Sequence, residues 1–168
     1  MNEQTLLWDG KPWRDGAKLP TKQTKTSAAY DVYAWTPLVD GKRTEIVIES
    51  MDSKIIRSGV NLNIPEGCCV DVKSRSGLAA KFKVFVLNGD GLVDDDYIGE
   101  GENYELGVIL MNLGTQPFVV KYLDRIAQIE LRDKMDEKLV DGSHKNYDEI
   151  KDARETNRMG GFGSTGRR

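Results

Sequence analysis

The stretch at residues 88–100, NGDGLVDDDYIGE, follows a β-forming run at residues 82–87 and organises the interpretation of the chain. Two turn-forming pairs, Asn88-Gly89 and Asp90-Gly91, stand between that run and Leu92-Val93. Asparagine, aspartate and glycine tolerate positive φ at little cost, so the pattern predicts a β-hairpin.

Three consecutive acids, Asp94, Asp95 and Asp96, follow the predicted hairpin. Because side chains alternate along an extended chain, Asp94 and Asp96 are expected on one face and Asp95 on the other. Charge runs usually form solvated faces, and the spacing fits no calcium-binding loop. The acids by themselves therefore leave open a solvated turn and a carboxylate aimed into a site.

Composition predicts one soluble and rather polar domain. The 168 residues are 30% charged and 39% hydrophobic, with a formal net charge of −3. No apolar run approaches the roughly 20 residues of a membrane span, and Asn2-Glu3-Gln4 does not begin a signal peptide. The adjacent Cys68 and Cys69 are expected to be reduced. We expect a cytoplasmic protein (in the host cytoplasm if viral) that binds no membrane and no nucleic acid.

Short apolar or alternating runs, with turn signals about every 8–12 residues, predict an all-β sandwich or barrel. A helical turn is expected at residues 78–81, and residues 1–17 are expected to be irregular, with Trp8 and Trp13 packed on the body. Strands are expected at residues 28–35, 44–50, 54–64, 68–73, 106–113, 118–122 and 125–131. The chain is divided into an N-terminal extension (1–17), a β core (18–132), a charged strap (133–157) and a glycine-rich C-terminal arm (158–168).

Three further patterns suit a ligand. Ser74-Arg75-Ser76-Gly77 offers a guanidinium, a hydroxyl and free backbone N–H groups for a phosphate, although serine-rich turns are also common without one. Gln128 places an amide within an apolar strand, where it is either a strand-edge residue or a ligand. In the tail, Phe162 has no local apolar partner, and the glycines around it leave N–H groups open to an anion, although a glycine-rich end can also be disordered.

Five segments together resemble the ordered motifs of the trimeric dUTPase family, from about residue 18 to the C-terminus. They are AAYDV at 28–32, RSGLA at 75–79, the stretch at 88–100, RIAQ at 125–128 and GGFGSTG at 160–166. Each motif is modest alone, but five in the family's order are specific. The resemblance implies an all-β, jelly-roll-like subunit in a homotrimer, with active sites shared between chains and a flexible C-terminal arm.

The resemblance also implies residue roles. Asp94 would orient and deprotonate the attacking water, Tyr97 would lie under the deoxyribose and exclude a 2′-hydroxyl, and Asp31 would support Mg²⁺ through water. The other implied substrate-binding residues are Asn88, Gly91 and Val93 for uracil; Arg75, Ser76, Gly77 and Gln128 for the α-phosphate; Phe162 over the base; and Gly163, Ser164 and Thr165 in the arm.

The chain departs from the family pattern at several positions. Ala29 stands at a usual glycine, Ser74 at a usual proline and Ile98 at a usual arginine or glutamine, and the segment at residues 101–107 is a few residues longer. That segment and the N-terminal extension are where a regulatory protein partner could dock.

A further departure concerns the arginine that the family places five residues before the tail phenylalanine. That position is Asn157 here. Arg158 and Arg154 are the candidates to clamp the γ-phosphate instead, and we favour Arg158 because the glycines after it could absorb a shift of one residue.

The expected function is Mg²⁺-dependent hydrolysis of dUTP to dUMP and pyrophosphate, which keeps uracil out of DNA and supplies dUMP for thymidylate synthesis. One alternative is a dCTP deaminase-like enzyme on the same fold, but the intact segment from Asp94 to Tyr97 and the tail favour dUTPase. A second alternative is a nucleotide-sensing, protein-binding module in which catalysis is secondary.

Overall fold

The computed structural model describes residues 9–135 and, beyond them, residues 137, 139, 141–143, 145–146, 149 and 153. The chain divides into two units, residues 1–135 and 136–168, and the first carries the fold described below. Trp8 lies outside the described residues. So do the candidate ligands near the C-terminus, which are Arg154, Arg158, Phe162, Gly163, Ser164 and Thr165.

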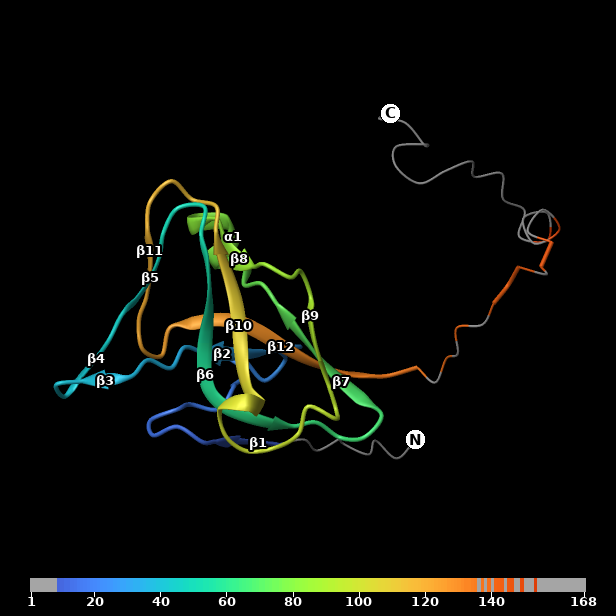
Figure 1. Cartoon of the computed structure of the whole chain (residues 1–168), viewed down its shortest axis with the longest axis horizontal. Helices are drawn as coiled ribbons and strands as arrows, with labels where there is room; N and C mark the ends of the chain where they lie inside the picture. Colours follow the sequence, from blue (N-terminus) through green and yellow to red (C-terminus); the bar gives the residue numbers. More distant parts are fainter. Residues whose placement is uncertain are drawn as a thin grey trace. The chain divides into compact units, whose positions relative to one another are not determined.

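Two four-stranded antiparallel sheets form the body (Figure 1). Their strand orders are β1-β6-β10-β8 and β2-β12-β7-β9, and two short pairs, β5-β11 and β3-β4, complete the fold. The elements are β1 Asp9–Pro12, β2 Tyr30–Tyr33, β3 Leu38–Val39, β4 Lys42–Arg43, β5 Ile46–Ile48, β6 Ser53–Asn63, β7 Cys68–Lys73, α1 Ser76–Phe82, β8 Val84–Val86, β9 Gly91–Asp94, the 3₁₀ helix Glu102–Tyr104, β10 Glu105–Asn112, β11 Phe118–Val120 and β12 Arg125–Asp133. The all-β prediction is confirmed.

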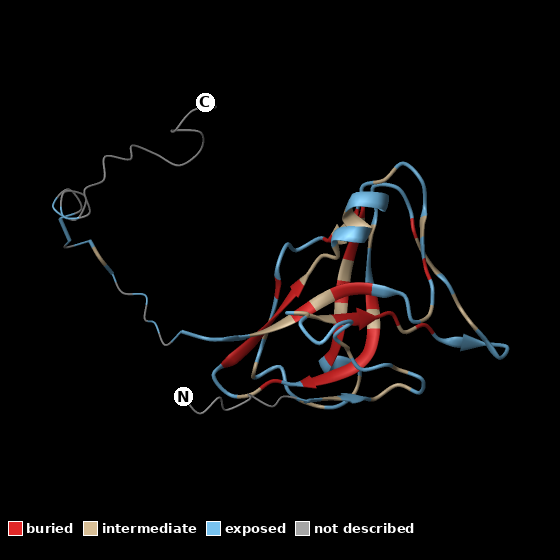
Figure 2. Cartoon of the chain, turned by 180° about the vertical axis from the view of Figure 1, so that it is seen from behind, coloured by how far each residue is buried: buried red, intermediate tan, exposed pale blue. Residues whose placement is uncertain are grey.

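Side chains from both sheets contribute to one apolar core. On β10 the buried residues Leu106, Val108 and Leu110 alternate with half-buried ones, the period of a strand with one face inward. On β7 every residue from Cys68 to Val72 is buried. Burial of each such aliphatic side chain contributes about 1.5–3 kcal/mol, so this layer is the main source of stability (buried residues are red in Figure 2). No helix in the described part of the chain is long and apolar enough to cross a bilayer.

The predicted hairpin at residues 82–93 is wrong. β8 pairs with β10 and β9 pairs with β7, so the turn between them carries the chain from one sheet to the other. Gly89 has a φ of 72° and donates its N–H to the Val86 carbonyl, as expected for a tight turn. Residues that tolerate positive φ suit such a crossing as well as a hairpin. The β run is also shorter than predicted, because α1 extends to Phe82 and Lys83 adopts a left-handed conformation.

The N-terminal extension is more regular than predicted, because β1 pairs with β6. Gly10 allows this approach: a Cβ there would lie 3.2 Å from the Asn61 carbonyl oxygen and 3.3 Å from the Leu62 side chain. Pro12 is tolerated because β1 is an edge strand. The expectation of irregular structure therefore fails at residues 9–12.

Candidate active site

A pocket of about 260 Å³ opens beside the end of β9. It brings together Asp94 and Tyr97 of the predicted site with the first residues of β10. The carboxylate of Asp94 is exposed, and within the described residues no side chain donates a hydrogen bond to it. An exposed carboxylate facing open space can reach a bound water. The lining residues are Leu92, Val93, Asp94, Asp96, Tyr97, Glu105, Leu106 and Gly107.

The three acids separate as their alternation predicted. Asp94 and Asp96 both line the pocket, whereas Asp95 accepts hydrogen bonds from the Gly67 N–H at 2.7 Å and from the Lys134 ammonium group. The Lys134 hydrogen bond, followed by that of Gly67, holds the pKa of Asp95 below its ordinary value. Asp95 therefore anchors the chain behind the pocket, and Asp94 and Asp96 are the two acids on its open side.

Tyr97 is fixed by its hydroxyl group, which donates to the Asn103 carbonyl at 2.8 Å and lies 3.4 Å from the Glu105 carbonyl. Its ring centre is 5.8 Å from that of Tyr104, with the two planes at 56°. Gly99 makes this packing possible, because a Cβ there would lie 2.5 Å from the Tyr104 ring. The Tyr97 ring is therefore held in place where it lines the pocket.

The predicted uracil-reading residues gather at β9. The Asn88 side chain lies against Gly91, where a Cβ would be 3.0 Å from the Asn88 amide nitrogen and 3.3 Å from Val72 Cβ. Gly91 is buried opposite Val72 of β7, and Val93 lines the pocket. Close packing thus favours glycine at residue 91, although its φ is not positive.

The predicted phosphate ligands meet where β2, β12 and β7 lie side by side. Gln128 of β12 pairs with Asp31 of β2 and with Lys73 of β7. Asp31 is 1% exposed. Its two oxygens accept hydrogen bonds from Arg75 Nε at 3.2 Å and from an Arg125 terminal nitrogen at 3.1 Å. Two cations around one buried carboxylate leave a positive charge at this place, which favours an anion.

The start of α1 adds backbone donors to the same region. Arg75 precedes the helix in an extended conformation, no side chain caps the first turn, and that turn holds no acid. Ser76 and Gly77 are exposed, and a Cβ on Gly77 would meet nothing within 4 Å. Ser74 ties the junction to the other sheet by accepting the Val86 N–H at 2.8 Å. Exposed N–H groups at a helix start suit a phosphate oxygen.

The two groups of predicted ligands lie at opposite ends of β7. Asp94 pairs with Cys69, whereas Arg75 follows the other end of the strand. Arg75 is six positions after Cys69, or roughly 20 Å away at about 3.3 Å per residue in an extended chain. A general base must lie within hydrogen-bond reach of the attacking water. The described part of one chain therefore does not bring Asp94 to the phosphate ligands near Arg75.

Sequence reasoning missed two residues that shape these places. Arg125 was part of a motif but had no assigned role, and it is a partner of Asp31. Glu105 lines the pocket with its side chain fully buried against Arg14. The roles of both residues depend on contacts between segments that are distant in the sequence. The only sequence signal for them is a charged side chain within an otherwise apolar strand.

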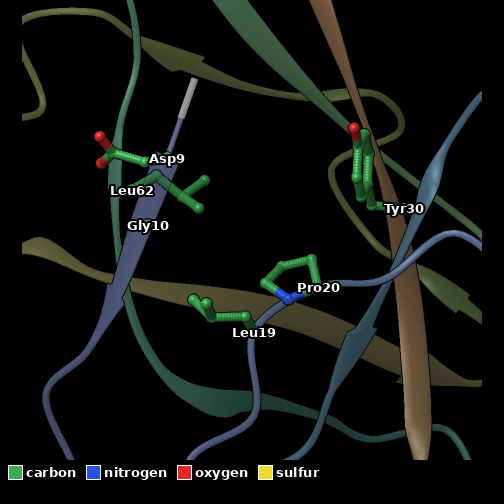
Figure 3. Close-up of a pocket in the computed structure, with 6 residues that line it drawn as sticks. All are labelled: Asp9, Gly10, Leu19, Pro20, Tyr30 and Leu62. Atoms are coloured by element: carbon green, nitrogen blue, oxygen red, sulfur yellow. The ribbon is translucent and has the colours of Figure 1, made fainter. Parts of the chain in front are cut away.

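A second pocket, also of about 260 Å³, lies between β1, β2 and β6 (Figure 3). It holds none of the predicted site residues, and apolar side chains form most of its wall. The chemistry predicted from the sequence therefore gathers at β9 and at the junction of β7 with α1. The lining residues are Asp9, Gly10, Leu19, Pro20, Tyr30 and Leu62.

Comparison with known proteins shows the family of the chain. The dUTPase family model matches residues 15–166. A deoxyuridine 5'-triphosphate nucleotidohydrolase of Anaplasma marginale is 36% identical over 152 residues, covering 90% of each chain. Its counterpart from a Wolbachia pipientis of Culex pipiens is 39% identical over 150 residues, covering 89% of this chain and 87% of the relative.

Solved structures show the same fold. A mutant of the Staphylococcus bacteriophage 80alpha dUTPase, solved with dUpNHpp, superposes with a TM-score of 0.70 at 21% identity, covering 96% of this chain and 99% of that one. A mutant dUTPase from phage phi11 of S. aureus, described with a coordinated structural Mg(II) ion, gives 0.67 at 19% identity, covering 81% and 96%. The two sheets thus define an all-β, jelly-roll-like fold that solved dUTPases share. The chain belongs to the dUTPase family.

Proposed function

We propose that this chain hydrolyses dUTP to dUMP and pyrophosphate, which keeps uracil out of DNA and supplies dUMP for thymidylate synthesis. Family membership supports the reaction. The observation that carries it is the pocket beside β9, where an exposed carboxylate, Asp94, and a braced aromatic ring, Tyr97, line one cavity. We also propose that the chain acts in the cytoplasm.

The chemistry follows from these groups. Asp94 takes a proton from a water molecule whose oxygen attacks the α-phosphorus, and the bond from that phosphorus to the bridging oxygen of the leaving pyrophosphate breaks. Negative charge grows on the phosphate oxygens, so positioned donors provide most of the stabilisation. The α-phosphate donors are Arg75, Ser76, the Gly77 N–H and Gln128.

The distance along β7 supports a site shared between chains. Because Asp94 and Arg75 stand at opposite ends of that strand, we propose a homotrimer in which a second chain brings its Arg75 region to the Asp94 pocket of the first. In the same proposal the arm comes from a third chain, with Phe162 over uracil, the residues Gly163, Ser164 and Thr165 on the phosphates, and Arg158 as the γ-phosphate clamp.

The described residues fit a magnesium ion that is held mainly by the substrate. Both oxygens of Asp31 already accept bonds from arginines, and within the described part of the chain no group of three or more His, Cys, Asp or Glu side chains could hold a metal. Mg²⁺ commonly keeps several waters and binds substrate phosphates. We propose that Asp31 meets the ion through water. When bound, the ion neutralises phosphate charge.

The test is hydrolysis of dUTP, UTP, dTTP and dCTP by the purified full chain, with pyrophosphate and ammonia both measured. Backbone groups that pair with uracil leave mismatched polar groups against cytosine, the thymine methyl clashes, and Tyr97 excludes ribose. We expect kcat/KM for dUTP to exceed each competitor by at least about 100-fold. Comparable turnover of dCTP or UTP would contradict the proposal, and ammonia release from dCTP would indicate the deaminase alternative.

A further inference from the structure

The segment that follows Tyr97 is held by the N-terminal extension and by β6. The Lys11 ammonium group lies 2.7 Å from a Glu100 oxygen. The Asn61 amide exchanges two hydrogen bonds with the backbone of Gly101, at 3.0 Å and 3.2 Å. One of these two anchors, Lys11, therefore lies in a segment that precedes the first motif of the family.

Arg14 is the strongest of these links. Its guanidinium carbon lies 4.2 Å from the ring centre of Trp13 and 4.5 Å from that of Trp35, so the group lies over both indoles. It donates to one Glu105 oxygen from two nitrogens, at 3.0 Å and 2.9 Å. It also lies 3.5 Å from Glu102, in the 3₁₀ helix beside the pocket. A stacked, forked contact of this kind is specific to arginine.

Glu105 connects the Arg14 contact to the pocket, which it lines. Its side chain is fully buried, and its other oxygen accepts the Gly59 N–H at 2.6 Å. Gly59 lies at a β-bulge, because Glu105 pairs with Asn61 whereas Gly107 pairs with Arg57. Glu105 therefore starts β10 in a position set by both β6 and Arg14. The Tyr97 hydroxyl donates to the carbonyl of Asn103, two residues before this start, and lies 3.4 Å from the carbonyl of Glu105 itself.

We propose that Arg14 is a positioning residue for the sugar-binding side of the pocket. Through Glu105 it holds the carbonyls that fix the Tyr97 hydroxyl, and so it sets the discrimination between deoxyribose and ribose. The inference rests on the proposed function, in which Tyr97 faces the sugar. A tyrosine ring excludes one hydroxyl group only while its place is fixed, so a looser anchor admits ribose.

The experiment is Arg14→Lys in the full chain, which keeps the charge opposite Glu105 but removes the fork and weakens the stack. Turnover is measured with dUTP, UTP and dCTP, and the dissociation constants of dUMP and UMP are measured by titration. We expect the kcat/KM of UTP relative to dUTP to rise about 5- to 10-fold, the effect of weakening a hydrogen bond. The ratio of the UMP to the dUMP dissociation constant should fall by a similar factor. The dCTP to dUTP ratio should not change, because the uracil-reading residues lie outside this network.

Arg43→Lys is the matched control. Arg43 also stacks on aromatic rings, with its guanidinium carbon 5.7 Å from the Trp35 ring centre and 4.1 Å from that of Tyr122, and it donates to the Asp15 carbonyl. It forms no hydrogen bond or ion pair with Glu105 among the described residues. We expect both selectivity ratios to stay at wild-type values in this variant.

A double variant tests whether Arg14 acts through Tyr97. Tyr97→Phe removes the hydroxyl directly, so it should reduce sugar selectivity, and adding Arg14→Lys should cause little further loss. If Arg14→Lys does not fold, Tyr97→Phe alone must still lower the sugar ratio, and an unchanged ratio overturns the proposal.

Two outcomes separate this inference from the proposed function. A folded Arg14→Lys chain with wild-type ratios for UTP and UMP overturns the role of Arg14 while leaving dUTP hydrolysis in place. A loss of sugar and base selectivity together also overturns it, because the pocket would then be loosened as a whole. If the wild-type chain hydrolyses no dUTP, the proposed function fails, and the ratio of the monophosphate dissociation constants still decides the role of Arg14.

Discussion

The two ends of β7 hold carboxylates in opposite settings. At the Arg75 end, Asp31 is buried and accepts hydrogen bonds from two arginines. At the Cys69 end, Asp94 is exposed at the edge of a pocket and accepts no side-chain hydrogen bond within the described residues. A carboxylate that neutralises arginines organises a place for an anion, whereas one facing open space can accept a proton. The difference supports the proposal that one end binds the phosphates and the other carries out the chemistry.

The largest expected effect comes from changing the catalytic end alone. Asp94→Asn keeps the size of the side chain and removes its basicity, so kcat for dUTP should fall by about 10²–10⁴-fold while nucleotide binding survives. Steady-state kinetics and nucleotide titration measure the two quantities. Asp95→Asn is the control, because that carboxylate faces Lys134 and Gly67. A larger loss of kcat in the control would contradict the assignment of Asp94.

Mixing variants tests whether the two ends serve one site in different chains. Asp94→Asn and Arg75→Ala homotrimers should each be nearly inactive, since each lacks one end of every site. After unfolding and refolding together, random trimers should place an intact Asp94 beside an intact Arg75 in about a quarter of the sites. The measurement is dUTP turnover before and after refolding. Activity that stays at the level of the separate variants, in trimers shown by light scattering to have mixed, would place both ends in one chain.

Some of this arrangement could be predicted from local sequence. The alternating run from Cys68 to Lys73 forms a strand with those bounds, and the alternation of the three acids placed Asp95 away from the pocket. These predictions succeed because strand periodicity is a property of neighbouring residues. The choice of Asp94 as the expected general base came from the family resemblance.

The remainder depends on which strands pair, and in what register, which local patterns do not state. The turn at Gly89 has the residues of a hairpin, yet it joins strands of different sheets. The contacts of Arg125 with Asp31 and of Arg14 with Glu105 could be predicted only once the pairing of the strands was known. Likewise, Arg75 and Asp94 are close in the sequence, but Arg75 follows one end of β7, whereas Asp94 pairs with Cys69 near the other end.

The arm extends the comparison to a third group of residues. Arg158 and Arg154 lie outside the described residues, so the choice between them stays a prediction from the sequence. Arg158→Ala should lower dUTP turnover by about 10-fold or more, because charge-assisted phosphate contacts are strong, with less effect on dUMP binding. Kinetics with dUTP and titration with dUMP measure this, and Arg154→Ala is the matched control. A neutral Arg158→Ala with a harmful Arg154→Ala would reverse the assignment.

The smallest effect concerns Asp95, which supports the catalytic end without taking part in it. The Lys134 hydrogen bond and then the Gly67 N–H lower the pKa of Asp95 below its ordinary 3.8, so this carboxylate stabilises the fold above that pH and the contribution is lost as pH falls through the lowered folded pKa. The Asp95 hydrogen bond raises the pKa of Lys134 above its ordinary 10.5, so the lysine's contribution is present below that pH and is lost as pH rises through the raised value.

Asp95→Asn should therefore lower the Tm most near neutral pH, and circular dichroism melts of the variant and of the wild-type chain should converge at the acidic and alkaline extremes. Lys121→Gln, at an exposed ion pair with Glu45 next to the paired strands β5 and β11, is the control and should show a smaller difference. A Tm difference between Asp95→Asn and wild type that does not change with pH would mean that Asp95 supports the pocket by its shape, since only the charged pair titrates.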